Sequence, residues 1–313
     1  MVRRAQMTRA LLILGPTASG KTALALRLAE RLDAEVINAD SMQVYRDLRI
    51  LTARPTRQEE AACPHHLFGA VDAAVRFSVG EWLRAATPLI DAIRDRGRTP
   101  LIVGGTGLYF KALTDGLAAI PDPPPEDTAA LRAALAEEGP EALHARLAEI
   151  DPDAARQLEP RDGVRIVRAL AVKQATGRSI LAWRADAAEP APLAPGTWAG
   201  FALTPPRELL YARIEARFAA MLNEGALQEV EALAARRLDP TLPAMKAHGA
   251  PWLMAHLAGA MPLPEAADLS VRDTRRYAKR QMTWITHQAA GFARIAETAV
   301  AEQEHALMVH IRV

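Results

Sequence analysis

The sequence predicts an α/β fold with a parallel sheet core, helices on both faces of the sheet, and a helical insertion. Short apolar segments alternate with helical patterns through the first 120 residues, which is typical of parallel strands joined by crossover helices. A proline-rich stretch at 121–125 ends this alternation, because a helix cannot pass through it. Helical patterns alone then continue to about residue 184. We expect one core formed by residues 1–120 and 197–313, and an insertion formed by residues 121–196.

The first half of the expected core contains three short strand candidates. Residues 11–14 and 101–103 are apolar runs of strand length, and the second of these ends at two glycines. Residues 35–38, with the sequence EVIN, are the other strand candidate. Between them, residues 22–32 and 79–96 carry apolar side chains at helical spacing. These segments predict a sheet with its helices in between.

Glycine and proline divide the second half of the chain. In the insertion we expect helix breaks at 139–140, 151–152 and 177. Residues 198–203 again have strand character. After them, long helical patterns run to about residue 288.

Composition limits the classes of function. The 38 Lys and Arg residues face 37 Asp and Glu, so the net charge of +1 gives no global signal for nucleic acid, and such a site would need local clustering. The single cysteine, Cys63, excludes an internal disulfide framework and an all-cysteine zinc site. No apolar run reaches the ~18–20 residues of a membrane span, and the run at 11–14 is too short for a signal peptide. We expect a soluble, cytoplasmic, monomeric protein.

The segment GPTASGKT at 15–22 fits the pattern G-x-x-x-x-G-K-[ST] between a predicted strand and a predicted helix. Glycines let such a loop wrap around an anion, and the amides at the helix start point inward. Lys21 supplies a positive charge to a phosphate, and Thr22 offers its hydroxyl to Mg²⁺. The motif predicts a P-loop NTPase-like core that binds a polyphosphate, ATP or another, with Mg²⁺ as cofactor. The alternative is an ordinary glycine-rich turn. The predicted phosphate-binding residues are Gly15, Pro16, Thr17, Ala18, Ser19, Gly20, Lys21 and Thr22.

Two polar residues follow the other predicted strands. Asp40 comes after 35–38, and Thr106 comes after 101–103 within a glycine-rich turn. The carboxyl ends of parallel strands are where open α/β sheets bind ligands. Asp40 could hold Mg²⁺ through water or act as a general base, and the alternative for both residues is a cap or turn role.

Several basic residues are candidates for binding phosphate groups. Arg213 and Arg217 lie four residues apart on a predicted helix and could clamp a diphosphate, or pair with Glu208 or Glu215. Two denser clusters could follow a phosphate backbone, or could be solvated helix faces. The first cluster, opposed only by Asp162, comprises Arg161, Arg165, Arg168, Lys173 and Arg178. The second cluster, opposed by Asp273, comprises Arg272, Arg275, Arg276, Lys279 and Arg280. The pair His65 and His66 lacks partners at metal-ligand spacing, and we interpret it as structural.

Separated motifs along the chain together resemble one family, the bacterial tRNA dimethylallyltransferases (isopentenyl-tRNA or IPP transferases). The resemblance covers about residues 10–290 and depends on the order and spacing of the motifs. They are GPTASGKT at 15–22, INADSMQVYR at 37–46, TARPT at 52–56, PHHL at 64–67, VGGTGLYFKAL at 103–113, RIVRAL at 165–170, RELLYARIEARF at 207–218 and TRRYAKRQMTWI at 274–285.

The resemblance implies a reaction, the Mg²⁺-dependent transfer of the dimethylallyl group of dimethylallyl diphosphate to N6 of adenosine 37 in tRNA. It assigns catalytic roles to four residues: Asp40 as the base, Thr106 in the reaction channel, and Lys21 and Arg217 on the diphosphate. It also implies tRNA contacts, partly through the insertion. The implied tRNA-binding residues are Asp40, Ser41, Met42, Gln43, Thr106, Arg132, Val164, Arg165, Ile166, Val167, Arg168, Lys246, His248, Gly249, Arg275, Arg276, Lys279 and Arg280.

Two other functions remain open from the residues alone. A small-molecule kinase could use the same phosphate loop, with Asp40 serving its chemistry. A non-catalytic, nucleotide-dependent RNA-binding module would explain the basic clusters, but it gives Asp40, Thr106 and Arg217 no shared task.

Overall fold

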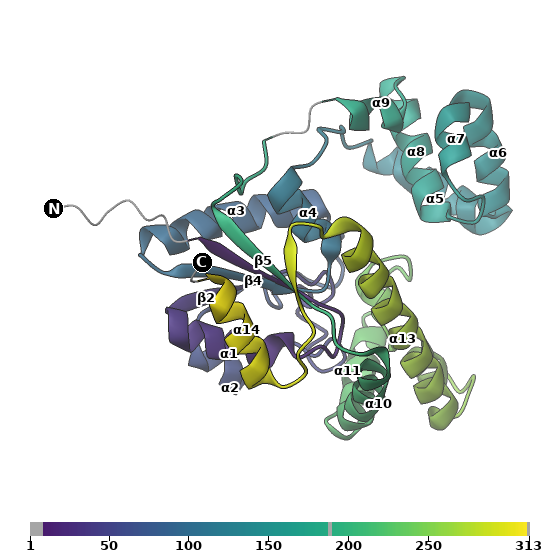
Figure 1. Cartoon of the computed structure of the whole chain (residues 1–313). Helices are drawn as coiled ribbons and strands as arrows, with labels where there is room; N and C mark the ends of the chain where they lie inside the picture. The colour runs from purple at the N-terminus through teal and green to yellow at the C-terminus, as the bar shows by residue number, and fades with distance from the viewer. Residues whose placement is uncertain (1–8, 187–189, 312–313) are drawn as a thin grey trace. The chain divides into compact units, whose positions relative to one another are not determined.

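The structure, a computed structural model, describes residues 9–186 and 190–311. Within them one parallel sheet has the strand order β3-β2-β4-β1-β5-β6 (Figure 1). The predicted parallel sheet is confirmed. Its strands are β1 (Ala10–Leu14), β2 (Ala34–Asn38), β3 (His65–His66), β4 (Thr99–Gly104), β5 (Trp198–Leu203) and β6 (Phe292–Ile295).

The strands alternate with helices, and local sequence explains several helix starts. Ser78 and Thr56 each begin a helix with a capping box. In each box the hydroxyl oxygen accepts a hydrogen bond from the backbone amide of a glutamate three residues later, and the carboxylate of that glutamate accepts one from the backbone amide of the Ser or Thr. The helices of this part are α1 (Lys21–Leu32), α2 (Arg57–Ala62), α3 (Val79–Asp95), α4 (Gly107–Asp115), α10 (Arg207–Asn223), α11 (Ala226–Ala235), the 3₁₀ turn η1 (Ala244–Lys246), α12 (Ala250–Leu257), α13 (Leu263–Gln288) and α14 (Val300–Ile311).

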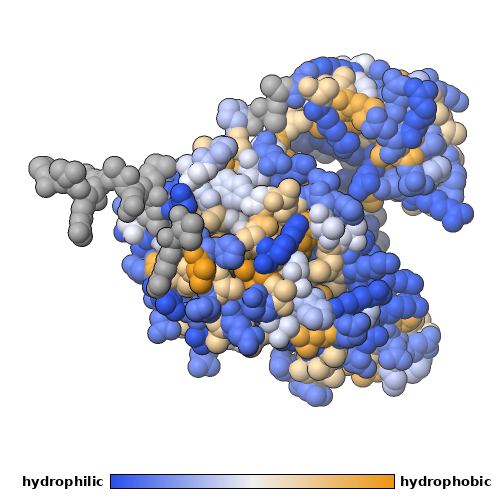
Figure 2. Space-filling model, in the orientation of Figure 1, coloured by the Kyte–Doolittle hydropathy of each residue, from blue (hydrophilic) through white to orange (hydrophobic). Residues whose placement is uncertain are grey.

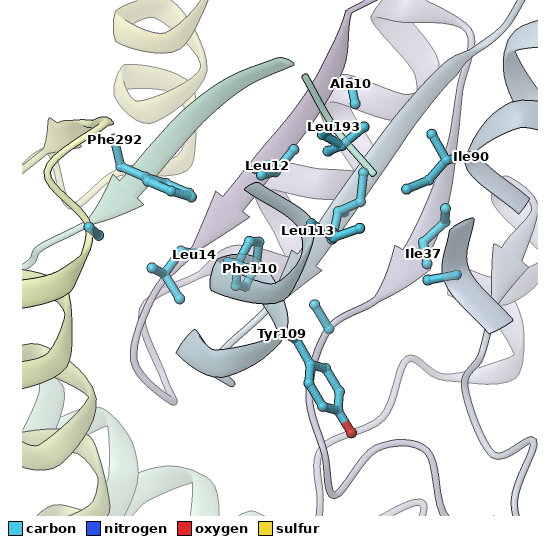
Figure 3. Close-up of a cluster of buried hydrophobic side chains, with 14 of the residues drawn as sticks. Ala10, Leu12, Leu14, Ile37, Ile90, Tyr109, Phe110, Leu113, Leu193 and Phe292 are labelled. Atoms are coloured by element: carbon cyan, nitrogen blue, oxygen red, sulfur yellow. The ribbon is translucent and has the colours of Figure 1, made fainter. Parts of the chain in front are cut away.

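Both faces of the sheet are covered by helices. Successive side chains of a strand point to opposite faces, so the continuous apolar run of β1 supplies two cores. Leu12 and Leu14 pack with residues of α3 and α4, including Ile90 and Phe110 (Figure 3). The other face of β1 packs with α1 and α14. This three-layer arrangement matches the predicted helices on both faces.

A third hydrophobic cluster lies beyond the carboxyl end of β2. It packs the loop residues Val44, Tyr45 and Leu48 against apolar side chains of α10, α11, α12 and α13. The long α13 is polar on its outer side, and the surface over it is largely hydrophilic (Figure 2). This cluster holds α10 and α13 beside the loops that end β1, β2 and β4.

A separate compact unit of helices interrupts the α/β unit. It comprises residues 115–191, and the α/β unit comprises the remaining parts of the chain. The smaller unit has its own apolar core, in which Leu143, Leu147, Ile166 and Leu170 are buried. Its boundaries fall slightly earlier than the expected 121 and 196, because α4 ends at Asp115 and Leu193 packs in the α/β core. Its helices are α5 (Pro125–Glu138), α6 (Pro140–Ile150), α7 (Pro152–Gln157), α8 (Gly163–Thr176) and α9 (Ile180–Ala185).

Among the helices of the described residues, none is long and apolar enough to cross a membrane.

Candidate active site

The phosphate loop joins β1 to α1 in a conformation that requires its small residues. Ala18 and Gly20 have positive φ angles of 65° and 94°, a region that favours glycine. The predicted helix begins at Lys21, so its unpaired amides face the loop. The Lys21 Nζ donates to the carbonyl of Pro16 at 2.7 Å, which folds the ammonium back over the loop.

Two cations lie at this loop with little compensating charge. Burial, and to a lesser extent Arg217, lower the pKa of Lys21 to about 8, although Asp40 opposes the shift. Burial also lowers the pKa of Arg217, and the negative charge of Asp40 again acts in the opposite direction. The guanidinium of Arg217 donates to the hydroxyl of Thr17 in the loop. The site therefore favours an anion with more than one negative charge.

The alternative partners that the sequence offered for the two arginines of α10 are wrong. Arg217 binds Thr17, and Arg213 donates to the carbonyl of Thr298 at 3.0 Å. Glu215 pairs instead with Arg275 at 2.7 Å. Both arginines line the phosphate pocket, as a diphosphate clamp requires.

Asp40 and Thr106 meet because β2 and β4 are neighbours in the sheet. The amide of Ser41 donates to the Thr106 hydroxyl at 2.9 Å, and the amide of Met42 donates to Asp40 Oδ1 at 2.9 Å. The turn role that the sequence allowed for Asp40 is therefore real, but it uses one carboxylate oxygen. The other oxygen, Oδ2, faces Gly105 on the neighbouring loop. One carboxylate can thus hold the turn and still accept a proton.

Glycines at the end of β4 and in the loop after it are required by close packing. A Cβ on Gly104 would lie 2.0 Å from the carbonyl oxygen of Ala39, and one on Gly107 would lie 2.3 Å from the indole ring of Trp284. A backbone atom cannot move aside cheaply, so the loop after β4 can approach the loop after β2 only with glycine here.

Two side chains of α13 reach this site and were not singled out as site residues from the sequence. Tyr277 hydrogen-bonds to Thr106, and its pKa is raised by burial and by the charge of Asp40. Gln281 contacts the phosphate loop and the loop after β4. Helical spacing placed both in a long helix, but no local pattern distinguished them from ordinary buried polar residues.

The site opens into a pocket of about 680 Å³. The whole segment 17–22 of the phosphate loop lines it, together with Asp40 and the two arginines of α10. A smaller adjoining cavity of about 60 Å³ is lined by Asp40, Arg217, apolar side chains of α10, and the aromatic pair His248 and Tyr277. The larger pocket has the size of a small-molecule site, and Asp40 lines both cavities.

Comparison with known proteins agrees with this geometry. The family model described as IPP transferase matches residues 43–288, and the model described as isopentenyl transferase matches residues 8–63. The chain belongs to the IPP transferase family. Two curated relatives, both named tRNA dimethylallyltransferase, cover nearly the whole chain. The one from Rhodopseudomonas palustris is 56% identical over 290 residues, 93% of this chain and 90% of the relative. The one from Nitrobacter hamburgensis is 57% identical over 283 residues, 90% of this chain and 89% of the relative.

Solved IPP transferases share the fold. The full-length tRNA isopentenylpyrophosphate transferase of Bacillus halodurans superposes with a TM-score of 0.69 at 36% identity, covering 97% of this chain and 95% of that one. A eukaryotic dimethylallyltransferase acting on tRNA superposes with a TM-score of 0.77 at 25% identity, covering 97% of this chain and 77% of that one. The P-loop-like α/β fold is therefore confirmed.

In this member of the IPP transferase family, α13 carries an exposed row of cations. Arg276, Lys279 and Arg280 are exposed, and Arg280 lies over the ring of Tyr277 at 5.6 Å. Arg275 is less exposed than these three; it pairs with Glu215 and lies over the ring of Tyr211. Arg276 also has an acidic partner, Asp273, at 3.4 Å. Three of the four predicted tRNA-binding cations of this helix therefore face solvent.

The remaining candidates of the α/β unit lie near the same cavities. His248 stacks on Tyr277 with ring centroids 4.3 Å apart, and burial and Arg280 lower the pKa of its imidazole. Lys246 is exposed at the end of η1. Gly249 has a φ of 97° where α12 begins. The amide nitrogen of Gln43 donates to the carbonyls of the loop at 52–53.

In the smaller unit, the structure corrects part of the predicted tRNA surface. Ile166 and Val167 are buried in the core of the unit, because they lie on the apolar face of α8, so their side chains present no surface to RNA. Val164 is 76% exposed beside the exposed Arg165, whereas Arg168 is half-buried. Arg132 lies half-buried on α5.

The first basic cluster is also less unopposed than the sequence suggested. Asp162, the one opposing acid that the sequence suggested, pairs with Arg165, and three further arginines of the cluster pair with other acids. They are Arg161 with Glu141, Arg168 with Asp122, and Arg178 with Asp186. A chain-local count of charges cannot detect these partners.

The adjacent histidines His65 and His66 have partners close by. His66 binds the carboxylate of Glu35 at 2.7 Å, and His65 contacts Cys63, in agreement with structural roles.

Among the described residues, no cluster of three or more His, Cys, Asp or Glu residues could hold a metal by itself. Thr22 and Asp40 both line the phosphate pocket and offer oxygen atoms. This sparse oxygen set fits Mg²⁺, which keeps several waters and binds through substrate phosphates.

Proposed function

We propose that this protein transfers the dimethylallyl group of dimethylallyl diphosphate to N6 of adenosine 37 in tRNA, next to the anticodon, and releases diphosphate. The names of its curated relatives support this reaction. The observation that carries the proposal is that one pocket holds a carboxylate and two cations. Asp40, Lys21 and Arg217 line the same pocket and influence one another's charge.

The cationic half of the site stabilises the leaving group. As the C1–O bond of the substrate breaks, the electron pair and the developing charge go to the diphosphate. Lys21 and Arg217 are both held at the loop by hydrogen bonds, where they and the loop amides would meet that charge. Preorganised groups of this kind are usually a large part of catalysis. Thr22 would hold Mg²⁺, and the ion would supply further positive charge to the diphosphate.

The other half of the site activates the nucleophile. N6 of adenine is a weak nucleophile, and it must lose a proton as the N6–C1 bond forms. The Oδ2 of Asp40 is the acceptor, because Oδ1 is occupied by the amide of Met42. Thr106, held by Ser41 and Tyr277, lies beside it and would position the adenine.

The tRNA supplies an adenine that must leave its stack to reach this pocket, as in other enzymes that modify bases. The exposed cations of α13 would bind the tRNA backbone, and Arg132, Val164, Arg165 and Arg168 of the smaller unit would add contacts. Cations of this kind supply affinity that depends on salt. We further propose that the protein acts as a monomer in the cytoplasm, where its tRNA substrate is found.

The decisive experiment follows two labels. Radiolabel in the dimethylallyl group should enter tRNA, and label in the γ-phosphate of ATP should enter neither RNA nor a small molecule. A kinase would show the reverse, and a non-catalytic binding module would transfer neither label.

The role of Asp40 is tested by Asp40→Asn in a single-turnover assay across Mg²⁺ concentrations. Asparagine keeps the hydrogen bond to Met42 but cannot accept the proton, so the rate should fall by about 10²–10⁴-fold with little change in the Mg²⁺ requirement. Asp33→Asn is the matched control, because Asp33 precedes β2 at its other end and pairs only with Arg98 among the described residues. Recovery of the Asp40→Asn rate in excess Mg²⁺ would identify Asp40 as a metal anchor instead.

A further inference from the structure

Gln281 is a buried polar side chain to which the reaction described above assigns no task. It lies on α13 and is only 6% exposed. Both ends of its amide are bonded: Oε1 accepts from the amide of Thr17 at 2.9 Å, and Nε2 donates to the carbonyl of Gly105 at 2.9 Å. One side chain therefore joins the phosphate loop to the loop after β4.

Each bond fixes a different half of the site. Thr17 is the phosphate-loop residue whose hydroxyl accepts a hydrogen bond from Arg217, so the first bond orients the leaving-group side of the site. Gly105 precedes Thr106 and faces Asp40 Oδ2, so the second bond orients the proton-accepting side. The distance between leaving group and base thus depends on the length of one glutamine side chain.

The fit around Gln281 leaves little freedom. A Cβ on Gly105 would lie 2.2 Å from Nε2, so the amide lies directly against the backbone of that loop. The site needs one acceptor and one donor at this separation, which a neutral amide supplies and an ionised carboxylate does not. A second anchor comes from Tyr277, one turn earlier on the same helix face, which binds Thr106.

We propose that Gln281 is a positioning residue that sets the separation between the diphosphate site and the Asp40–Thr106 pair. The catalytic part of this inference rests on the proposed function, whereas its binding part concerns the phosphate loop alone. Misplacement of reacting groups by about 1 Å can cost about 10²-fold in rate, so a connection of this kind would matter without contacting the reacting atoms.

The two bonds can be separated by substitution. Gln281→Glu keeps an acceptor for Thr17 but replaces the donor to Gly105 with a charge that repels its carbonyl. Gln281→Ala removes both bonds. Thr283→Ala is the control, because Thr283 is exposed on the same helix and bonds only to the carbonyl of Lys279 among the described residues.

Two quantities are measured for each variant: the Kd of dimethylallyl diphosphate without tRNA, and the single-turnover rate at saturation with both substrates. We expect Gln281→Glu to change the Kd by less than about 3-fold and to lower the rate by about 10²-fold. Gln281→Ala should weaken binding by about 10-fold or more and lower the rate at least as much. Thr283→Ala should match the wild type in both.

The outcomes are separable. Equal loss of diphosphate binding in Gln281→Glu and Gln281→Ala, or a wild-type rate in either, would overturn the assignment. Melting temperatures identify a variant that fails to fold, and the near-isosteric Gln281→Glu then carries the test. If the wild-type protein transferred no prenyl group to tRNA, the proposed function would fail, and the difference in Kd between the two variants would still decide whether Gln281 orients the phosphate loop.

Discussion

Binding of a prenyl diphosphate should be accompanied by uptake of a proton at Lys21. In the protein without ligand, burial and Arg217 lower the pKa of this ammonium to about 8. A diphosphate adds negative charge beside the ammonium and raises its pKa again, because a nearby opposite charge favours the charged form. At pH values above about 8, the free protein therefore lacks a proton that the complex holds.

The expected uptake follows from these pKa values. If the pKa of Lys21 is about 8 before binding and above about 10 afterwards, binding takes up about half a proton at pH 8 and about 0.9 at pH 9. At pH 6 the uptake is close to zero, because Lys21 is protonated in both states. The affinity should accordingly fall by about tenfold per pH unit above pH 8, until the pKa of the complex is reached.

Calorimetric titration in buffers of different ionisation enthalpy measures this uptake directly. Dimethylallyl diphosphate is used without tRNA, so that no transfer occurs, and Mg²⁺ is held constant. The terminal phosphate of the ligand has a last pKa of about 6, so the ligand itself contributes little at pH 8–9. His248 is neutral in this range, since its pKa is lowered from its ordinary value.

The matched variant is Lys21→Arg, which keeps a cation that does not titrate in this range. We expect no proton uptake in this variant at any of these pH values. The same uptake in Lys21→Arg as in the wild type would assign the proton to another group. No uptake by the wild-type protein at pH 9 would refute the inference that burial discharges Lys21 before the ligand binds.

Three further outcomes follow from the structure. Replacing the exposed cations of α13, Arg276, Lys279 and Arg280, with alanine should weaken tRNA binding. In filter-binding assays across a salt series, the slope of log K against log salt concentration should become shallower by about 0.7–0.9 per lost contact. Glu35 has its pKa lowered to about 2, chiefly by Arg96, so it should contribute up to about 3 kcal/mol of stability above pH 4.5 that is lost as the pH falls toward 2. Denaturant titrations should show a flatter acid dependence for Glu35→Gln. Gly104→Ala should lower the free energy of unfolding by at least about 2 kcal/mol, measured the same way, because its Cβ would overlap the backbone of Ala39; wild-type stability would contradict the packing argument.

Local sequence was sufficient for most elements of the sheet. The strand expected at 198–203 is β5 without change, and the runs at 11–14 and 101–103 each lie within a slightly longer strand. Apolar runs bounded by glycine, and apolar side chains at helical spacing, are signals carried by neighbouring residues. β3 and β6 were missed because they are short and lie at the sheet edges, where pairing with a distant strand defines them.

The phosphate loop was likewise determined by the sequence itself. Its conformation needs only small residues at fixed spacing, a strand before it and a helix after it, all within 15–22 and its flanks. The sequence also placed Asp40 and Thr106 at the carboxyl ends of strands. It could not bring their loops together, because the bond between Thr106 and Ser41, the neighbour of Asp40, requires β2 and β4 to be adjacent in the sheet.

The resemblance assigned Arg217 to the diphosphate, but only the tertiary structure showed which contacts bring distant side chains into the site. Arg217 binds a loop 200 residues earlier in the chain, and Gln281 reaches one 264 residues earlier. Packing inside the smaller unit buries Ile166 and Val167, which the resemblance had placed on the tRNA surface. Packing inside the α/β unit gives Arg275 an acidic partner. The physical reason is that hydrophobic periodicity and backbone preferences act over a few residues, whereas a hydrogen bond between distant segments depends on how their helices and strands pack. An arginine or glutamine in a helical pattern looks the same whether it faces water or a phosphate loop.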